Sequence, residues 1–173
     1  MDNYGFIREK VDIKVLVLFI LKHLPAPVDG NMLLEMTMCD NAINYFDYTE
    51  CLSELQETGH IVMVDDGYSI TGFGRETLAE MESELPYTIR MKAGAAAQRA
   101  AKILNREALI QTTHERKADG SCNVLLGLSD DAGQIMKLEI LAGSETQATQ
   151  METRFRKNAE ALYLKITGIL TEE

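Results

Sequence analysis

The stretch that decides the fold is NAINYFDYTECLSELQETGHIVMVDDGYSITGFGRETL, residues 41–78. From Asn41 to Thr58 its apolar side chains recur at intervals of three and four residues, which predicts a helix with one apolar face. The residues of that face are Tyr45, Tyr48, Cys51, Leu52 and Leu55. Gly59 then supplies the left-handed conformation that commonly ends a helix.

After Gly59 the pattern changes from the period of a helix to that of a strand. Residues 60–64 are rich in β-branched side chains, residues 65–67 read Asp-Asp-Gly, and residues 68–71 return as a second strand. Because Asp-Asp-Gly is a tight-turn sequence, this order predicts a β-hairpin.

A fourth helix is expected to follow the hairpin. Thr71 is placed to cap it, and Leu78 and Met81 lie on its apolar side. We interpret Gly72-Phe73-Gly74 as the corner between strand and helix, where glycine accommodates a positive φ.

Two more helices are predicted before residue 41. Asp12 is placed to cap the first, whose apolar face is Ile13, Leu16, Val17, Ile20 and Leu24 and which Pro25 ends. Asp29 is placed to cap a shorter one that carries Met32, Leu33, Met36 and Met38. Three helices, a hairpin and a further helix are typical of a winged helix-turn-helix, which reads DNA when its third helix enters the major groove.

One set of these residues follows a family pattern: Tyr48, Leu52, Leu55, Gly59, Ile61, Tyr68, Ile70, Thr71, Gly74 and Leu78. The set resembles bacterial winged-helix regulators of the PadR and MarR type, including their Y-x-I/L-T-x-x-G return strand. Nearly the whole chain also resembles an uncharacterised bacterial domain-of-unknown-function family that is similar to such regulators. The segments that carry this second resemblance include DIKVLVLFILKHLPAPV, LPYTIR and AEALYLKITGIL. The resemblance implies a regulator and brings no catalytic motif.

The net charge of −10 excludes a general attraction to nucleic acid or to an anionic membrane. The acidity belongs to one half of the chain. Residues 1–85 hold sixteen acidic and five basic residues, whereas residues 86–173 hold eleven and twelve. Since this step falls at Pro86, we predict a winged helix-turn-helix domain over 1–86 and a second domain over 87–173.

Four acidic residues share one side of the predicted third helix, because they are spaced by three or four positions. They are Asp47, Glu50, Glu54 and Glu57. Three interpretations stay open: a solvated helix face, a surface for a protein partner, and a side that faces the DNA groove against electrostatic repulsion. For groove contact, the candidate residues near the helix start are Asn41, Asn44 and Tyr45.

A basic stripe follows the proposed boundary. Residues 87–106 contain no acid, and Lys92, Arg99, Lys102 and Arg106 align on one side of a predicted helix. This stripe is interpreted either as a phosphate-contacting or dimer-spanning surface, or as a partner for the acidic domain.

The rest of the chain predicts a small antiparallel sheet. Segments 108–116, 122–128 and 134–141 read as strands joined by turn sequences. Ser144 is placed to cap a long helix, whose apolar stripe of Met151, Phe155, Ala159, Leu162, Ile166 and Ile169 or Leu170 is expected to cover the sheet. The expected fold is thus α+β, with a second domain suited to dimerisation, sensing or protein contact.

No enzyme is expected, and no cofactor, metal or catalytic residue. The three histidines, His23, His60 and His114, are far apart, and no nucleophile, metal or phosphate-loop motif is present. The three cysteines do not form a CxxC pair, and the longest apolar stretch, 15–21, is too short for a bilayer. We therefore expect a cytoplasmic homodimer that binds double-stranded DNA. The alternative is a winged-helix module that binds another protein through the acidic face and has no DNA affinity.

Overall fold

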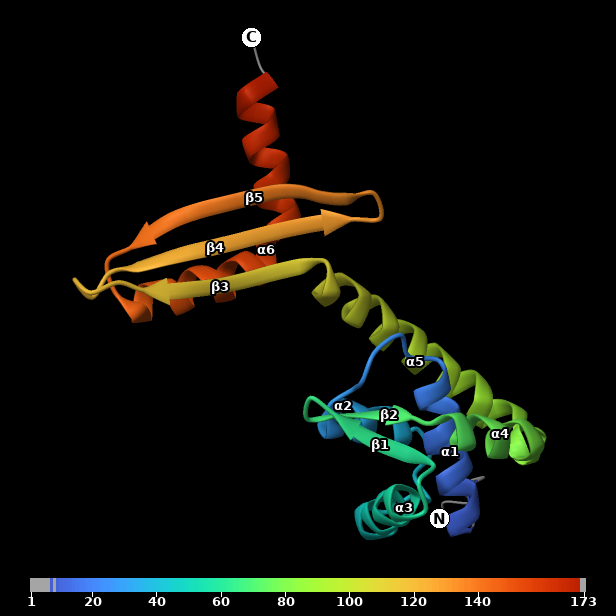
Figure 1. Ribbon diagram of the computed structural model, residues 1–173. Coiled ribbons are helices and arrows are strands. Elements are labelled where there is room, and N and C mark those ends of the chain that lie inside the picture. The colour runs from blue at the N-terminus through green and yellow to red at the C-terminus, as the bar shows by residue number, and fades with distance from the viewer. Residues whose placement is uncertain (1–6, 8, 172–173) are drawn as a thin grey trace. The chain divides into compact units, whose positions relative to one another are not determined.

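The computed structural model describes residue 7 and residues 9–171, which form a mixed α+β fold (Figure 1). These residues contain six α-helices, a short 3-10 helix, a two-stranded sheet and a three-stranded antiparallel sheet. The α+β class is therefore as predicted. The chain divides into two compact units, of which the first ends at Leu104 and the second begins at Asn105.

The division lies inside helix α5, Tyr87–Ala108, and not at Pro86 as the charge step predicted. The reason is burial. Ile89, Ala93 and Ala97 of α5 have no exposed surface and belong to the core of the first unit. Small alanine side chains let this helix approach closely, so its first part is held by the acidic half of the chain.

Three helices surround the core of the first unit: α1, Lys10–Lys22, α2, Gly30–Thr37, and α3, Tyr45–Glu57. All seven residues from 15 to 21 are buried, because α1 contacts α2, α3, α4 (Gly72–Met81) and the hairpin. Helix α1 is thus the central element of this unit.

The caps differ from the predicted ones at two helices. Helix α1 starts one turn earlier than expected, with Glu9 as its N-cap, and the Asp12 carboxylate accepts the Glu9 backbone N–H at 3.2 Å. Helix α3 starts later, after Asn44, because the Asp40 side chain accepts the Ala42 N–H at 2.9 Å and holds a turn there. The predicted cap Asp29 of α2 is confirmed, since it accepts the N–H groups of the next turn.

A hairpin of β1, Ile61–Val64, and β2, Gly67–Ile70, follows α3 as predicted. Both turn residues, Asp65 and Asp66, have positive φ. A further antiparallel bridge joins Val28, in the link between α1 and α2, to Tyr68 of β2 through N–H···O bonds of 3.1 and 2.8 Å. The link is therefore hydrogen-bonded to the hairpin through β2.

The corner between β2 and α4 is tight. Thr71 caps α4 as predicted, because its hydroxyl accepts the Gly74 N–H at 3.0 Å and donates to the Gly59 carbonyl at 2.8 Å. The predicted positive φ at Gly72 and Gly74 is wrong, whereas Gly59 does have it. Glycine is needed at 74 for a different reason: a Cβ there would lie 2.2 Å from the His60 carbonyl oxygen. A 3-10 helix, Glu82–Glu84, ends this segment.

The second unit is a meander of β3, Ile110–Arg116, β4, Cys122–Asp130, and β5, Gly133–Ala142, in that order, with α6, Glu145–Thr171, on one face (Figure 1). Ser144 caps α6 as predicted. The apolar stripe of α6 packs on the sheet from Ala148 to Ile166. Ile169 and Leu170 were expected to continue it but are 75% and 77% exposed.

Candidate nucleic-acid interface

The residues predicted to face a DNA groove lie at the start of α3. Asn41 is exposed in the turn between α2 and α3. Asn44 is the N-cap: its side-chain oxygen accepts the Asp47 N–H at 2.9 Å, and its amide donates to the Asp47 carboxylate. Tyr45 begins the helix and is 57% exposed, so its predicted place on the apolar face is wrong. These three residues form one exposed segment.

Two of the four acidic residues of α3 are turned toward α1. Glu50 forms an ion pair with Lys10 at 2.5 Å, and Glu54 forms one with Lys14 at 2.5 Å. The hydrogen bond from Lys14 holds the pKa of Glu54 below its ordinary value, and the bond to Glu50 raises the pKa of Lys10. The middle of the acidic stripe is therefore neutralised by lysines of the same unit.

The ion pairs divide the outer surface of α3 into two sides. Beside the acidic stripe runs a neutral strip of Tyr45, Phe46, Thr49, Ser53 and Gln56, all of them exposed or half-buried. The buried side is Tyr48, Cys51, Leu52 and Leu55, as predicted. Burial raises the pKa of Tyr48. Helix α3 thus presents uncharged aromatic, hydroxyl and amide groups without an intervening carboxylate.

The four basic residues of the predicted α5 stripe are divided between the two units. Lys92, Arg99 and Lys102 belong to the first unit and are exposed, and no ion pair joins them to another of the described residues. Arg99 lines a groove of about 360 Å³ with Met32 and Glu35 of α2. Arg99 therefore lies beside α2.

Lys92 lies near the turn between α2 and α3. The pKa of Cys39, at this turn, is raised by burial and by the charge of Asp40, and the Lys92 ammonium opposes that rise. Lys92 is thus close to the segment that exposes Asn41.

Arg106 is engaged within the second unit. Its guanidinium donates to both carboxylate oxygens of Glu160, at 2.7 and 2.8 Å, and to the backbone carbonyl of Arg156 at 2.7 Å. This pairing raises the pKa of Arg106 and lowers that of Glu160. The donors of Arg106 are therefore occupied, and the predicted stripe of four cations is reduced to three.

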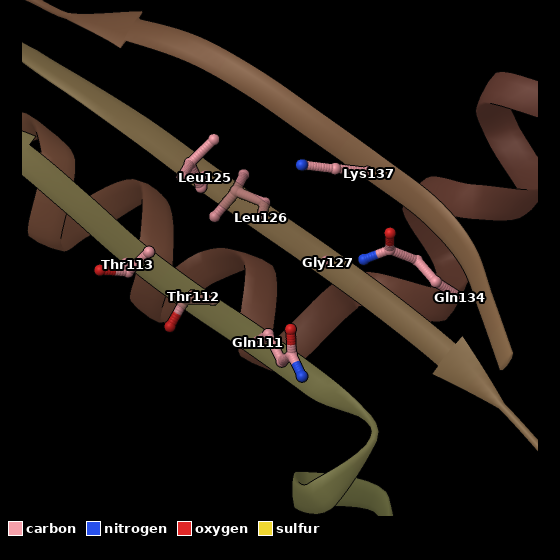
Figure 2. Close-up of a pocket in the computed structure, with 8 residues that line it drawn as sticks. All are labelled: Gln111, Thr112, Thr113, Leu125, Leu126, Gly127, Gln134 and Lys137. Carbon is pink, nitrogen blue, oxygen red and sulfur yellow. The ribbon is translucent and has the colours of Figure 1, made fainter.

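A shallow depression of about 290 Å³ lies on the face of the second unit's sheet opposite α6 (Figure 2). Figure 2 shows side chains of all three strands around it, with Gln111 and Thr113 on β3, and Gln134 and Lys137 on β5. Gly127 of β4 forms its floor, since a Cβ there would lie 3.2 Å from the Gln134 amide nitrogen. Five of its eight lining residues are polar, namely Gln111, Thr112, Thr113, Gln134 and Lys137.

Two further features bear on the site. Among the described residues, no group of three His, Cys, Asp or Glu side chains is arranged to hold a metal ion. Within the same residues, no helix has the length and apolar character needed to cross a bilayer.

Two features of α3 were not predicted from the sequence. They are its pairing with Lys10 and Lys14 and the polar residues of its neutral strip, Thr49, Ser53 and Gln56. The spacing of residues in the sequence indicates both features. Lys10 and Lys14 are spaced by four residues, as are Glu50 and Glu54, which is the pattern of two helices joined by parallel ion pairs. Thr49, Ser53 and Gln56 recur at helical spacing, as the acids do.

The comparison with known families adds one finding. The family that matches is described as Domain of unknown function (DUF4364), and the match covers residues 13–170. No curated protein and no solved structure matches the chain. The expected membership of an uncharacterised family is confirmed, whereas the likeness to PadR and MarR regulators stays a prediction. Since the match spans most of the sequence, the chain belongs to the DUF4364 family.

Proposed function

We propose that this protein is a transcriptional regulator of the winged-helix type, which binds double-stranded DNA as a homodimer in the cytoplasm. The order of elements in the first unit supports this: α1, the bridge at Val28, α2, α3 and the β1–β2 hairpin. This order is that of a helix-turn-helix with a wing. In such a module, α3 is the helix that enters the major groove.

The observation that carries the proposal is the pairing of Glu50 and Glu54 with Lys10 and Lys14. An acidic recognition helix would be repelled by phosphate, because the nearest charges dominate at physiological ionic strength. With two carboxylates paired, the neutral strip is the side of α3 suited to base edges, through its polar residues Tyr45, Thr49, Ser53 and Gln56. Hydroxyl and amide side chains hydrogen-bond to bases in the major groove.

Phosphate contacts are assigned to Lys92, Arg99 and Lys102 of α5 and to Asn41. The first helix of a helix-turn-helix crosses the DNA backbone. In the proposed module this first helix is α2. Arg99 lies beside α2 and Lys92 lies near the turn that follows it, which supports phosphate contacts by these two cations. Arg106 is left out, since Glu160 holds it.

The test is a titration with random duplex DNA at several salt concentrations. We expect binding at low salt, and we expect the variant K92Q/R99Q/K102Q to reduce the slope of log K against log salt by about 0.9 for each phosphate that the protein no longer neutralises. The control R154Q/K157Q/K165Q removes the same charge from α6 and should leave the slope unchanged. No binding at low ionic strength would reject DNA binding, and an equal effect of both triples would reject α5 as the phosphate surface.

A second function, recognition of a partner protein without DNA, is favoured by one observation. Phe46 is 80% exposed and Tyr45 is 57% exposed, with ring centroids 6.1 Å apart. Exposed aromatic pairs beside charged residues are typical of protein interfaces. This function predicts no DNA binding at any salt concentration, which separates it from the first.

A further inference from the structure

Helix α6 is fastened to the second unit along one of its sides. Three residues of that side, spaced by four, contact the end of α5 or strand β3. Glu152 forms a hydrogen bond with His114 at 3.2 Å, and two ion pairs join Arg156 to Glu107 at 3.2 Å and Glu160 to Arg106 at 2.7 Å. Helix α6 packs more extensively against β3 and β4 than against β5.

The other side of α6 borders a groove along β5. The groove has a volume of about 290 Å³, and its lining residues are Leu126, Ile140, Met151, Arg154, Phe155, Asn158 and Leu162. Ile140 is 38% exposed, whereas Met136 on the same face of β5 is 8% exposed. The groove therefore exists because α6 does not cover this part of the sheet.

The polar groups of the groove come from one part of α6. Arg154 is exposed, and no ion pair joins it to another described residue. Asn158 has a non-helical backbone, with φ −132° and ψ 17°, and its side-chain amide donates to the Arg154 carbonyl at 2.9 Å. The lining holds no acidic residue, so a single cation and an amide stand beside apolar walls.

We propose that this groove binds a small apolar monocarboxylate, namely an aromatic or short-chain acid. The ring or acyl chain lies against Leu126, Ile140 and Phe155, and the Arg154 guanidinium holds the carboxylate. A guanidinium matches a carboxylate with two parallel hydrogen bonds, which favours an acid over a neutral molecule. Size agrees as well, because an apolar cavity of roughly 150 Å³ is enough for benzene.

The ligand class follows from the lining, which is apolar with few polar groups, as in most small-molecule sites. A cation without an acidic neighbour selects an anion, and an apolar wall rejects a strongly hydrated one such as free phosphate. The unit in which it lies is separate from the one assigned to DNA, so the inference stands without the proposed function.

The test uses the full chain and the methyl signals of its isoleucine, leucine and methionine residues in NMR spectra. Hexanoate and phenylacetate are titrated against their neutral counterparts, hexanol and 2-phenylethanol. We expect the acids to shift the signals of Leu126, Ile140 and Met151, and to bind at least about tenfold more tightly than the alcohols. R154Q should weaken the acids about tenfold and leave the alcohols unchanged.

The matched control is K157Q, which removes the same charge three residues further along α6 at a side chain outside the groove. It should change the affinity for the acids less than about twofold. I140W should fill the groove and abolish binding. If that variant does not fold, the affinities of R154Q and K157Q for the acids are compared to test the proposal. Equal affinity for acids and alcohols, or no shift at about 10 mM acid, would overturn the proposal. The proposal would also be overturned if the same methyl signals shifted when the protein self-associates without any acid, because a second copy would then occupy the groove.

Discussion

At the scale of single residues, Lys10 and Lys14 determine what α3 offers to a partner. Each holds one carboxylate of α3 at 2.5 Å, so the charge of the outer surface depends on residues of α1. These pairs are exposed, and their direct contribution to the free energy of unfolding is small. Their effect lies in the electrostatic potential along α3.

The variant K10Q/K14Q is expected to weaken DNA binding by more than the loss of two distant charges would. It leaves Glu50 and Glu54 unpaired beside the proposed reading face, where they repel phosphate. The control K22Q removes a lysine from the same helix that pairs with Glu82 at 2.7 Å, away from α3. Fluorescence anisotropy with duplex DNA measures both. Equal losses per lysine removed would contradict the assigned role of α3.

The carboxyl groups predict how stability depends on pH. The pKa values of Glu54 and Glu160 are both held below the ordinary 4.5 by hydrogen bonds from Lys14 and Arg106. A lowered pKa in the folded state stabilises the protein above the unfolded value, and this contribution is lost as the pH falls below 4.5. Thermal unfolding between about pH 3 and pH 7 should show that E160Q loses less stability on acidification than the parent does. E115Q, at an exposed position of β3, is the control and should follow the parent.

At the scale of elements, the β2–α4 corner depends on close approach. Gly74 contacts the carbonyl of His60 at a distance that excludes any Cβ, and Thr71 fastens the same corner to Gly59. The hairpin and α4 are thus held together by the close backbone approach at Gly74 and by the hydroxyl of Thr71.

G74A should therefore unfold this corner, at a cost of several kcal/mol, because the methyl group would overlap backbone atoms that cannot move aside. Gly72 is the matched control, since a Cβ there meets nothing within 4 Å. Urea unfolding followed by circular dichroism measures both variants. A loss below about 1 kcal/mol for G74A would show that the corner relaxes.

Most elements were predictable because their signals are local. The hairpin followed from Asp-Asp-Gly between two β-branched runs, and the caps at Asp29, Thr71 and Ser144 followed from residue type. The start of α3 was missed because Asp40 competes with Asn41 for the preceding turn. The exposure of Tyr45 and the approach at Gly74 depend on neighbours distant in sequence, which no local pattern contains.

At the scale of the whole molecule, two hydrophobic cores share no residue. The first gathers α1 to α4, the hairpin and the start of α5, and the second gathers β3 to β5 and α6. The charge step at Pro86 did not predict their division, because alanines of a basic helix pack in an acidic unit. Of the candidate site, the residue types were predictable but the engagement of Arg106 by Glu160 was not, since it joins residues 54 positions apart.

Separate cores predict separate responses to core substitutions. L52A should cost the first unit about 2–5 kcal/mol, and F155A should cost the second about 3–5 kcal/mol. Hydrogen exchange monitored by mass spectrometry should show faster exchange in residues 9–104 for the first variant and in residues 105–171 for the second. Both side chains are buried, so each substitution changes the packing of a core and not the surface. Acceleration of both units by either variant would show that they unfold together.

The bridge between Val28 and Tyr68 has a mechanical consequence. Two backbone hydrogen bonds join Tyr68, close to the turn of the hairpin, to the connection between α1 and α2, and Gly67 packs against Pro27 beside them. We therefore expect a displacement of the hairpin to move the link before α2 with it, because these backbone hydrogen bonds join the two segments.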